Sequence, residues 1–196
     1  MQQAAILVFD GCEPIEAFTV VDVLSRTGLF EITILGLPDT PTITTAHGIT
    51  VSPHRTLAQV AEITYDLIVI PGGPAATKEK FYMDQDIHTF IQRHHERNRT
   101  VAAICAAPLV LGHAGILENK PATCYPALKE KLLPLCRSYS EDKVVRTGNV
   151  ITSRGPGTAL LFALSIVKAL VSCEEAVKIG KDMLVSGQDL DDLRCA

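Results

Sequence analysis

Apolar runs alternate with segments of mixed polarity along the 196-residue chain. The run at Ala4–Phe9 is continuously apolar, which is typical of a strand buried on both faces of a sheet. Similar runs predict further strands at Glu31–Leu37, Asp66–Ile70 and Thr100–Ile104. Segments with apolar residues at helical spacing separate and follow these strands: Phe18–Leu29, Leu57–Ile63, Asp84–Asn98, a helix from about Ala107, Thr158–Val171 and Cys173–Val185.

Two further segments complete the pattern: Ile43–Ser52 is a hairpin or an excursion at the sheet edge, and Val144–Ser153 is a hairpin. Strands that alternate with helices indicate right-handed βαβ crossovers, so we expect an α/β fold with a mainly parallel sheet covered on both faces. In such sheets the functional site lies at the carboxyl ends of the strands. Two loops at such ends carry candidate chemistry: Pro71-Gly72-Gly73-Pro74 and Cys105-Ala106-Ala107-Pro108.

The composition narrows the class of protein. Hydrophobic residues make up 47% of the chain and charged residues 20%, which is unlike a disordered protein. The net charge is −4 without a basic block, which argues against nucleic-acid binding. No apolar run reaches the roughly 18 residues of a membrane span, and the N-terminus lacks the basic segment of a signal peptide. We therefore expect one cytoplasmic domain over residues 1–196, with a core at about 4–185 and a frayed tail at 186–196.

Six cysteines need an interpretation: Cys12, Cys105, Cys124, Cys136, Cys173 and Cys195. None forms a C-x-x-C pair, so a zinc site or a thioredoxin-type motif has little support. Because the cytosol keeps thiols reduced, a disulfide framework is not expected either. Most of these cysteines are therefore interpreted as small buried hydrophobes.

Cys105 differs from the others in its local sequence. A buried strand runs into it, and Pro108 suits the first turn of a following helix. The sulfur would then lie on a strand-to-helix turn resembling a nucleophile elbow, although the flanking glycines of G-x-S-x-G are absent. The helix N-terminus would stabilise a thiolate there and lower its pKa. The alternative is an inert buried cysteine at a strand end.

Two further segments offer partners for this sulfur. Gly72 and Gly73 let backbone N–H groups approach a ligand, and a pair of such groups facing Cys105 could form an oxyanion hole. A plain Gly/Pro turn is the alternative. Glu16, after the first strand, could face inward, where burial would raise its pKa and let it store a proton. Its alternative role is that of an ordinary acid at a helix N-terminus.

Three histidines fall on one predicted helix: His88, His94 and His95. No H-E-x-x-H motif accompanies them, so a zinc site has no support. Charged residues surround them, which indicates a solvated helix face.

Four motifs, in chain order, resemble the DJ-1/ThiJ/PfpI superfamily, and most closely its DJ-1 and bacterial ThiJ/YajL branch. They are GCEPIEA at Gly11–Ala17, VIPGG at Val69–Gly73, AAICAAP at Ala102–Pro108 and TSRGPGT at Thr152–Thr158. The resemblance spans about Ala4 to Val185. It implies a flavodoxin-like three-layer sandwich with a mainly parallel central sheet, a homodimer, and chemistry that requires no metal or organic cofactor.

The resemblance also implies roles for individual residues. Cys105 would be the reactive nucleophile and Glu16 its partner acid. The backbone amides of Gly73 and Ala106 would form the oxyanion pocket. Further residues would line the site or lie near it: Gly72, His47, Cys124 and Arg154. His47 stands where relatives often carry arginine.

Two departures from the family pattern limit the chemistry. Peptidase-like members place histidine directly after the elbow cysteine, where this chain has Ala106, and this argues against a peptidase. DJ-1-like relatives commonly carry histidine at the position of Cys124, so an imidazole base is missing here. Cys124 either fills that space or resolves an oxidised Cys105 through a reversible disulfide.

These features support two main hypotheses. The first is a Cys105-dependent enzyme that acts on small reactive carbonyls such as methylglyoxal, a glutathione-independent glyoxalase or protein deglycase-like lyase or hydrolase. The second is an oxidative-stress sensor or chaperone-like protein without a dedicated substrate, whose exposed thiol oxidises readily. A third label used for ThiJ-like proteins, thiazole monophosphate biosynthesis, has no residue-level support.

The apolar residues of the first predicted helix indicate that the protein forms a homodimer. It carries more apolar residues than one buried stripe requires: Phe18, Val20, Val21, Val23 and Leu24. We expect the excess to form part of a two-fold interface close to the active site. No nucleic-acid or membrane partner is expected.

Overall fold

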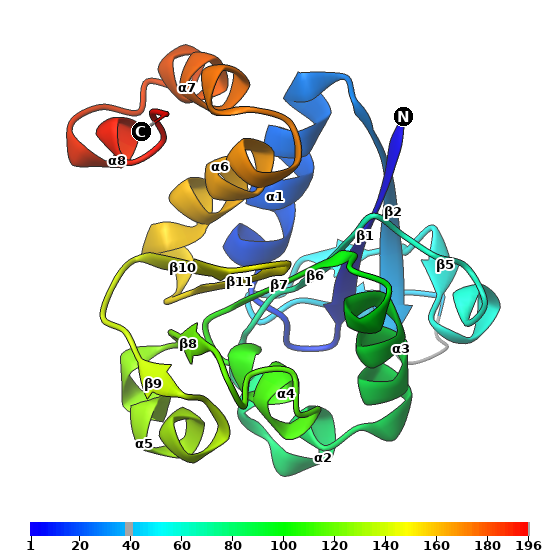
Figure 1. Ribbon diagram of the computed structural model, residues 1–196. Coiled ribbons are helices and arrows are strands. Elements are labelled where there is room, and N and C mark those ends of the chain that lie inside the picture. The colour runs from blue at the N-terminus through cyan, green and yellow to red at the C-terminus, as the bar shows by residue number, and fades with distance from the viewer. Residues whose placement is uncertain (38–40, 196) are drawn as a thin grey trace.

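The computed structural model describes residues 1–37 and 41–195. Within these residues a seven-stranded sheet has the order β10-β11-β7-β6-β1-β2-β5 (Figure 1). Neighbouring strands are parallel except for the antiparallel pair β10 and β11. The strands are β1 Gln2–Phe9, β2 Phe30–Leu37, β5 Arg55–Thr56, β6 Leu67–Ile70, β7 Thr100–Ile104, β10 Val144–Thr147 and β11 Val150–Ser153.

Helices flank both faces of this sheet (Figure 1). On one side pack α1 Pro14–Thr27, α6 Ala159–Leu170 and α7 Cys173–Asp182; on the other lie α2 Glu79–Tyr82, α3 Gln85–Glu96 and α4 Pro108–His113. The smaller elements are β3 Ile43–Thr44, β4 Thr50–Val51, β8 Pro121–Ala122, β9 Ser138–Tyr139, α5 Lys129–Leu132 and α8 Gln188–Asp191. The expected α/β three-layer sandwich with a mainly parallel sheet is confirmed.

The three central strands owe their position to their sequences. Every residue of β6 and β7 is buried, as are the last six residues of β1, because helices cover both faces of these strands. From β1 the chain proceeds to β2 on one side, whereas β6 lies on the other. The strand order therefore reverses between β1 and β6, which is the place where α/β sheets bind ligands.

Two helices differ from their predicted bounds. The first helix begins at Pro14 rather than Phe18, because the Glu13 side chain accepts the Ile15 N–H and caps it. It ends at Gly28, which adopts a left-handed φ of 66°. The predicted helix at Leu57–Ile63 is only a single 3-10 turn at Ala58–Val60.

The expectation of a solvated histidine face is wrong for two of the three histidines. His88 is 5% exposed and His94 is fully buried. His94 Nδ1 donates to the Phe90 carbonyl oxygen at 2.7 Å, while its Nε2 accepts the Tyr65 N–H at 3.0 Å. Both ring nitrogens are thus satisfied in the neutral form, and burial lowers the pKa of His94. Its role is to join α3 to the chain that leads into β6.

The end of the chain differs from the predicted frayed tail. Residues 188–191 form α8, and Leu193 is fully buried. Cys195 forms a disulfide with Cys173 at the start of α7, although no disulfide was expected. Side-chain contacts of the tail with α6 and α7, which a charge-rich local sequence does not reveal, hold it in place.

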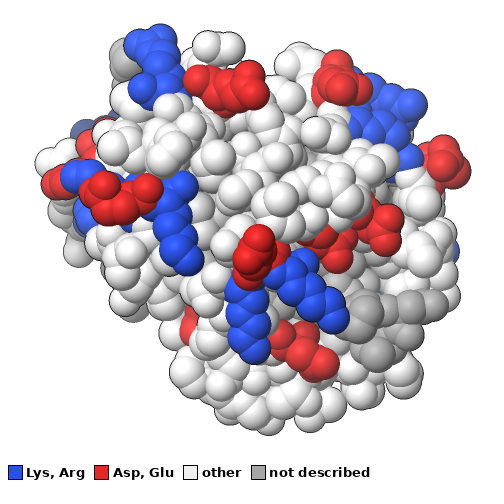
Figure 2. Space-filling model, turned by 90° about the horizontal axis from the view of Figure 1, so that it is seen from below, with Lys and Arg blue, Asp and Glu red and all other residues white. Residues whose placement is uncertain are grey.

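The distribution of charged side chains and the lengths of the helices bear on the expected partners. Seen from below, on the face shown in Figure 2, acidic and basic side chains of the described residues lie in small mixed groups rather than in one extended basic patch. None of the helices in residues 1–37 and 41–195 is long and apolar enough to span a membrane.

Candidate active site

Cys105 lies at the carboxyl end of β7 and adopts a φ of 65°. This left-handed conformation is costly for a residue with a side chain and marks a strained turn. Two backbone hydrogen bonds hold it, since the Cys105 N–H donates to the Ser153 carbonyl oxygen at 3.0 Å and the Tyr125 N–H donates to the Cys105 carbonyl oxygen at 2.8 Å. With α4 starting at Pro108, the segment has the strand-turn-helix form of a nucleophile elbow.

Glu16, in the first turn of α1, is fully buried. The Gly72 N–H donates to its Oε2 atom at 2.7 Å, while Oε1 is buried and has no N–H or O–H partner among the described residues. Burial raises the pKa of Glu16 to about 7, against the opposing effects of the Gly72 hydrogen bond and of a hydrogen bond with the Cys105 thiol. The carboxyl group is therefore able to hold a proton near neutral pH.

The glycines after β6 leave room for the sulfur and the carboxyl group. A Cβ atom on Gly72 would lie 2.7 Å from the Cys105 Cβ and 2.9 Å from Glu16 Oε2, so no side chain fits there. Gly73 has a φ of 121°, and a Cβ on it would collide with the Gly11 carbonyl oxygen. Backbone hydrogen bonds from Gly73 and from Ala106 favour the thiolate form of the Cys105 sulfur.

The expected low pKa of the Cys105 thiol is not what the structure gives. Burial and the Glu16 carboxylate raise the pKa of Cys105 to about 12, although hydrogen bonds from the Gly73 and Ala106 amides favour the thiolate. A buried carboxyl group and a half-buried thiol in contact cannot both ionise near neutral pH. The pair therefore carries at most one negative charge there, and a thiolate forms when the shared proton resides on Glu16.

A residue that the sequence reasoning did not single out joins His47 to the site. Glu13 is 8% exposed, and its Oε2 atom lies 3.1 Å from Nε2 of the exposed His47. The backbone N–H of Glu13 donates to the Gly72 carbonyl oxygen at 3.0 Å, and the charge of Glu13 contributes to the raised pKa of Glu16. The signal was present in the sequence, because Glu13 and Glu16 are three residues apart at a helix start and so face the same side.

Cys124 and Arg154 each follow or precede a residue that is hydrogen-bonded to the Cys105 backbone, Ser153 for Arg154 and Tyr125 for Cys124. Cys124 is fully buried, and its thiol donates to the neighbouring Tyr125 carbonyl oxygen at 3.3 Å. Burial and the nearby Cys136 raise the pKa of Cys124 to about 12, while Arg154 opposes this. Arg154 itself donates to the Glu141 carbonyl oxygen. The buried thiol of Cys124 is thus already hydrogen-bonded to its own neighbour, which favours the space-filling interpretation.

Comparison with known proteins identifies the family. A model of the DJ-1/PfpI family matches residues 2–169. The chain belongs to the DJ-1/PfpI family. Protein dj-1beta of Drosophila melanogaster is 35% identical over 186 residues, which cover 94% of this chain and 98% of that protein. The glutathione-independent glyoxalase DJR-1.2 of Caenorhabditis elegans is 33% identical, with the same two coverages.

Solved structures agree with this assignment to the DJ-1/PfpI family. The structure of oxidized Toxoplasma gondii DJ-1 superposes with a TM-score of 0.88 at 29% identity, covering 95% of this chain and all of that one. Drosophila melanogaster DJ-1beta gives a TM-score of 0.86 at 33% identity, covering 95% of this chain and 99% of that one. The resemblance read from four sequence motifs is thereby confirmed, and so is the flavodoxin-like fold that it implied.

Proposed function

We propose that this DJ-1/PfpI protein is a Cys105-dependent enzyme that acts on small reactive carbonyls without glutathione. The observation that carries the proposal is the arrangement around one sulfur: the amides of Gly73 and Ala106 point at it, and the buried acid Glu16 contacts it. Such amides stabilise an oxygen anion that develops next to the sulfur. The name of the glyoxalase relative supports the same class of substrate.

A 2-oxoaldehyde such as methylglyoxal would react in four steps. The Cys105 thiolate bonds to the aldehyde carbon, and the aldehyde oxygen, held by the two amides, takes the proton stored on Glu16. The Glu16 carboxylate then removes the proton from that carbon and returns it to the adjacent carbon, while the hydroxyl proton passes from the former aldehyde oxygen to the ketone oxygen, which leaves the thioester of a 2-hydroxy acid. Water cleaves the thioester, releases a 2-hydroxy acid and restores the thiol. No other base is required, consistent with the absence of an imidazole at Cys124.

The same groups around the Cys105 sulfur also favour a second candidate function, redox sensing. A sulfinate on Cys105 would accept hydrogen bonds from the Gly73 and Ala106 amides and from protonated Glu16. Mild peroxide treatment followed by mass spectrometry separates the candidates. Selective oxidation of Cys105 without carbonyl turnover would favour the sensor.

We also propose that the chain acts as one domain and as a homodimer. Within the chain, Val20, Val23 and Leu24 of α1 are buried, while Phe18 and Val21 remain partly exposed. These two side chains leave apolar surface at the site end of the helix for a second copy. Sedimentation at micromolar concentration should show a dimer, and a monomer would contradict this part of the proposal.

The enzymatic proposal is tested by following methylglyoxal consumption and 2-hydroxy acid formation with purified protein. We expect turnover by the wild type and none above background for Cys105→Ser, with Cys136→Ser as the matched control at a half-buried free cysteine. Turnover that survives Cys105→Ser would remove Cys105 from the mechanism. Absence of turnover in wild type with a reduced Cys105 would remove this substrate class.

A further inference from the structure

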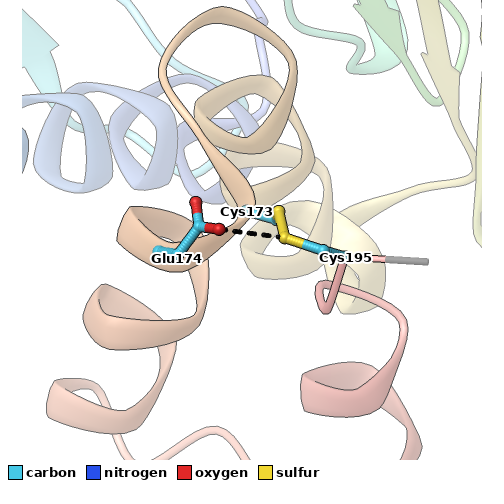
Figure 3. Close-up of side chains that lie close together, drawn as sticks. All are labelled: Cys173, Glu174 and Cys195. Atoms are coloured by element: carbon cyan, nitrogen blue, oxygen red, sulfur yellow. Dashed lines mark hydrogen bonds between the residues drawn. A yellow bond between two sulfur atoms is a disulfide. The ribbon is translucent and has the colours of Figure 1, made fainter.

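The disulfide between Cys173 and Cys195 lies outside the matched family region, which ends at residue 169. Cys173 is the first residue of α7, and Cys195 follows α8, so the bond joins the end of the chain to the start of α7 (Figure 3). The two Cα atoms are 5.6 Å apart, a separation that suits a disulfide. Cys195 is exposed and Cys173 half-buried, so small thiols and disulfides can reach the bond.

The bond closes a segment whose other attachments are few. Leu193 is fully buried, and together with Leu190 it covers Gly180, with side-chain carbons 3.1–3.5 Å from the place where a Cβ would be. Lys168 of α6 donates to the carbonyl oxygens of Asp192 and Arg194 at 2.9 and 2.8 Å. Lys143 forms a partly exposed ion pair with Asp189. One buried leucine and the contacts of two lysines are a weak anchor for the nine residues 187–195, so the cross-link is expected to decide whether the tail stays docked.

The two sulfurs have different surroundings. Cys173 lies at the N-terminus of the ten-residue helix α7, where backbone amides and the helix dipole favour a thiolate. Glu174 Oε1 lies 3.2 Å from the Cys195 sulfur (Figure 3), and hydrogen bonds with its own backbone N–H and with Ser172 lower the pKa of Glu174. This carboxylate disfavours a thiolate on Cys195. Cys173 is therefore the better leaving group and Cys195 the more accessible sulfur for attack.

We propose that Cys173 and Cys195 form a reversible thiol–disulfide latch that docks the C-terminal segment 187–195 on α6 and α7, independently of Cys105. In oxidation by a low-molecular-weight disulfide, the Cys173 thiolate attacks one of its sulfurs and expels one thiol. Cys195 then displaces the second thiol and closes the protein disulfide. In reduction, an external thiolate attacks Cys195 and expels the Cys173 thiolate, and a second thiol removes the mixed disulfide. Each cycle interconverts two protein thiols plus one disulfide with one protein disulfide plus two thiols.

Hydrogen exchange of the full-length chain tests the latch. Cys105→Ser protein is equilibrated in reduced or in oxidised glutathione, and exchange of the amides in 188–194 is followed by mass spectrometry. A cross-link over a separation of 22 residues suppresses opening by one to two orders of magnitude, so exchange should be at least about tenfold slower in the oxidised protein. Cys195→Ser and Cys173→Ser should exchange at the fast rate in both buffers, whereas Cys136→Ser should keep the difference.

Three results would overturn the latch. One is equal exchange of residues 188–194 in both buffers despite a formed disulfide. Another is a pair that stays as free thiols in oxidised glutathione. The third concerns metal binding, because ligand atoms of Cys173, Glu174 and Cys195 lie within 4.8 Å of one another. If stoichiometric Zn²⁺ binds the reduced protein, and binding is lost in Cys195→Ser, the cluster is a cation site and not a latch.

Discussion

The Gly72 N–H donates a 2.7 Å hydrogen bond to Oε2 of Glu16 and so fixes the buried carboxyl group beside the Cys105 elbow. Gly72 lies in the loop after β6 and Glu16 in the first turn of α1, which follows β1, so the two residues come from either side of the place where the strand order reverses. The position of the acid is thus set by a backbone group that no side-chain substitution can remove. What a substitution can change is whether the acid holds a proton and whether the space around it stays open.

Replacing Glu16 by glutamine should separate activity from stability. Carbonyl turnover should fall by at least about 10²-fold, since an amide cannot move a proton. The pKa of Glu16 is about 7 in the folded protein against an ordinary 4.5, so the folded state binds this proton more tightly. Its stabilising effect is therefore present below pH 4.5 and lost as the pH rises through 7.

For that reason Glu16→Gln should be more stable than the wild type at pH 8, by roughly 1–3 kcal/mol, and show no such gain at pH 4.5. Denaturant unfolding at both pH values measures this difference. A variant that keeps normal turnover, or that is equally destabilised at both pH values, would show that Glu16 does not store the proton.

Gly72→Ala should damage the site and the fold together. Its Cβ would lie 2.7 Å from the Cys105 Cβ and 2.8 Å from the Ala106 nitrogen, so the elbow must move. We expect a loss of about 1–3 kcal/mol in the free energy of unfolding and at least about 10²-fold in turnover. Gly157→Ala is the matched control, because a Cβ there meets nothing within 4 Å. Equal effects of the two substitutions would refute the steric argument.

The Glu13–His47 pair should set the pH range of turnover. The charge of Glu13 raises the pKa of Glu16, so Glu13→Gln should shift the pH profile of turnover to lower pH. His47 Nε2 lies 3.1 Å from Glu13 Oε2, so a fixed positive charge at this position would oppose the charge of Glu13. His47→Arg should accordingly shift the profile to lower pH, and His47→Ala should not. Identical profiles in all four proteins would show that this pair does not act on Glu16.

Cys124→Ala should leave both turnover and the yield of Cys105 sulfinate unchanged. The Cys124 thiol is buried and donates to the Tyr125 carbonyl oxygen, and burial raises its pKa to about 12, so little thiolate forms to attack an oxidised Cys105. Peroxide titration with mass spectrometry of the Cys105 peptide compares the yields. A higher sulfinate yield in the variant would revive the resolving role.

His94 should make the protein less stable in mild acid. Burial lowers its pKa below the ordinary 6.5, so the unfolded chain binds this proton more readily than the folded one. Stability should therefore fall as the pH drops below about 6.5. Urea midpoints at pH 7.5 and 5.5 measure the fall, which should shrink in His94→Gln. The same fall in that variant as in the wild type would assign it to other groups.

The sequence predicts the elements at the centre of this molecule better than its edges. Residues 4–9 of β1, all of β6 and residues 101–104 of β7 are continuous apolar runs, which indicate a sheet covered on both faces, and Gly28 and Asp84 mark helix ends by their own chemistry. By contrast, the burial of His94 depends on Tyr65, 29 residues away, and the pairing of Cys173 with Cys195 depends on how α8 folds back. Such long-range contacts leave no local pattern.

The same distinction holds for the candidate site. Cys105, Gly73 and Glu16 could be named because each follows or precedes a recognisable strand or helix. Their pKa values could not, since they depend on mutual burial: the helix N-terminus favours a thiolate, yet burial and the Glu16 carboxylate outweigh it at Cys105. A local argument about one residue therefore gave the wrong direction for a property that belongs to the pair.

The most direct test of this coupling is the rate of Cys105 alkylation by iodoacetamide as a function of pH, in wild type and in Glu16→Gln. If the two groups share one proton, the wild-type rate should rise with a midpoint near pH 7, where the pair loses that proton. In Glu16→Gln this step should disappear and the midpoint should move to higher pH, toward that of the thiol alone. The same midpoint in both proteins would contradict the account, because Cys105 would then titrate without Glu16.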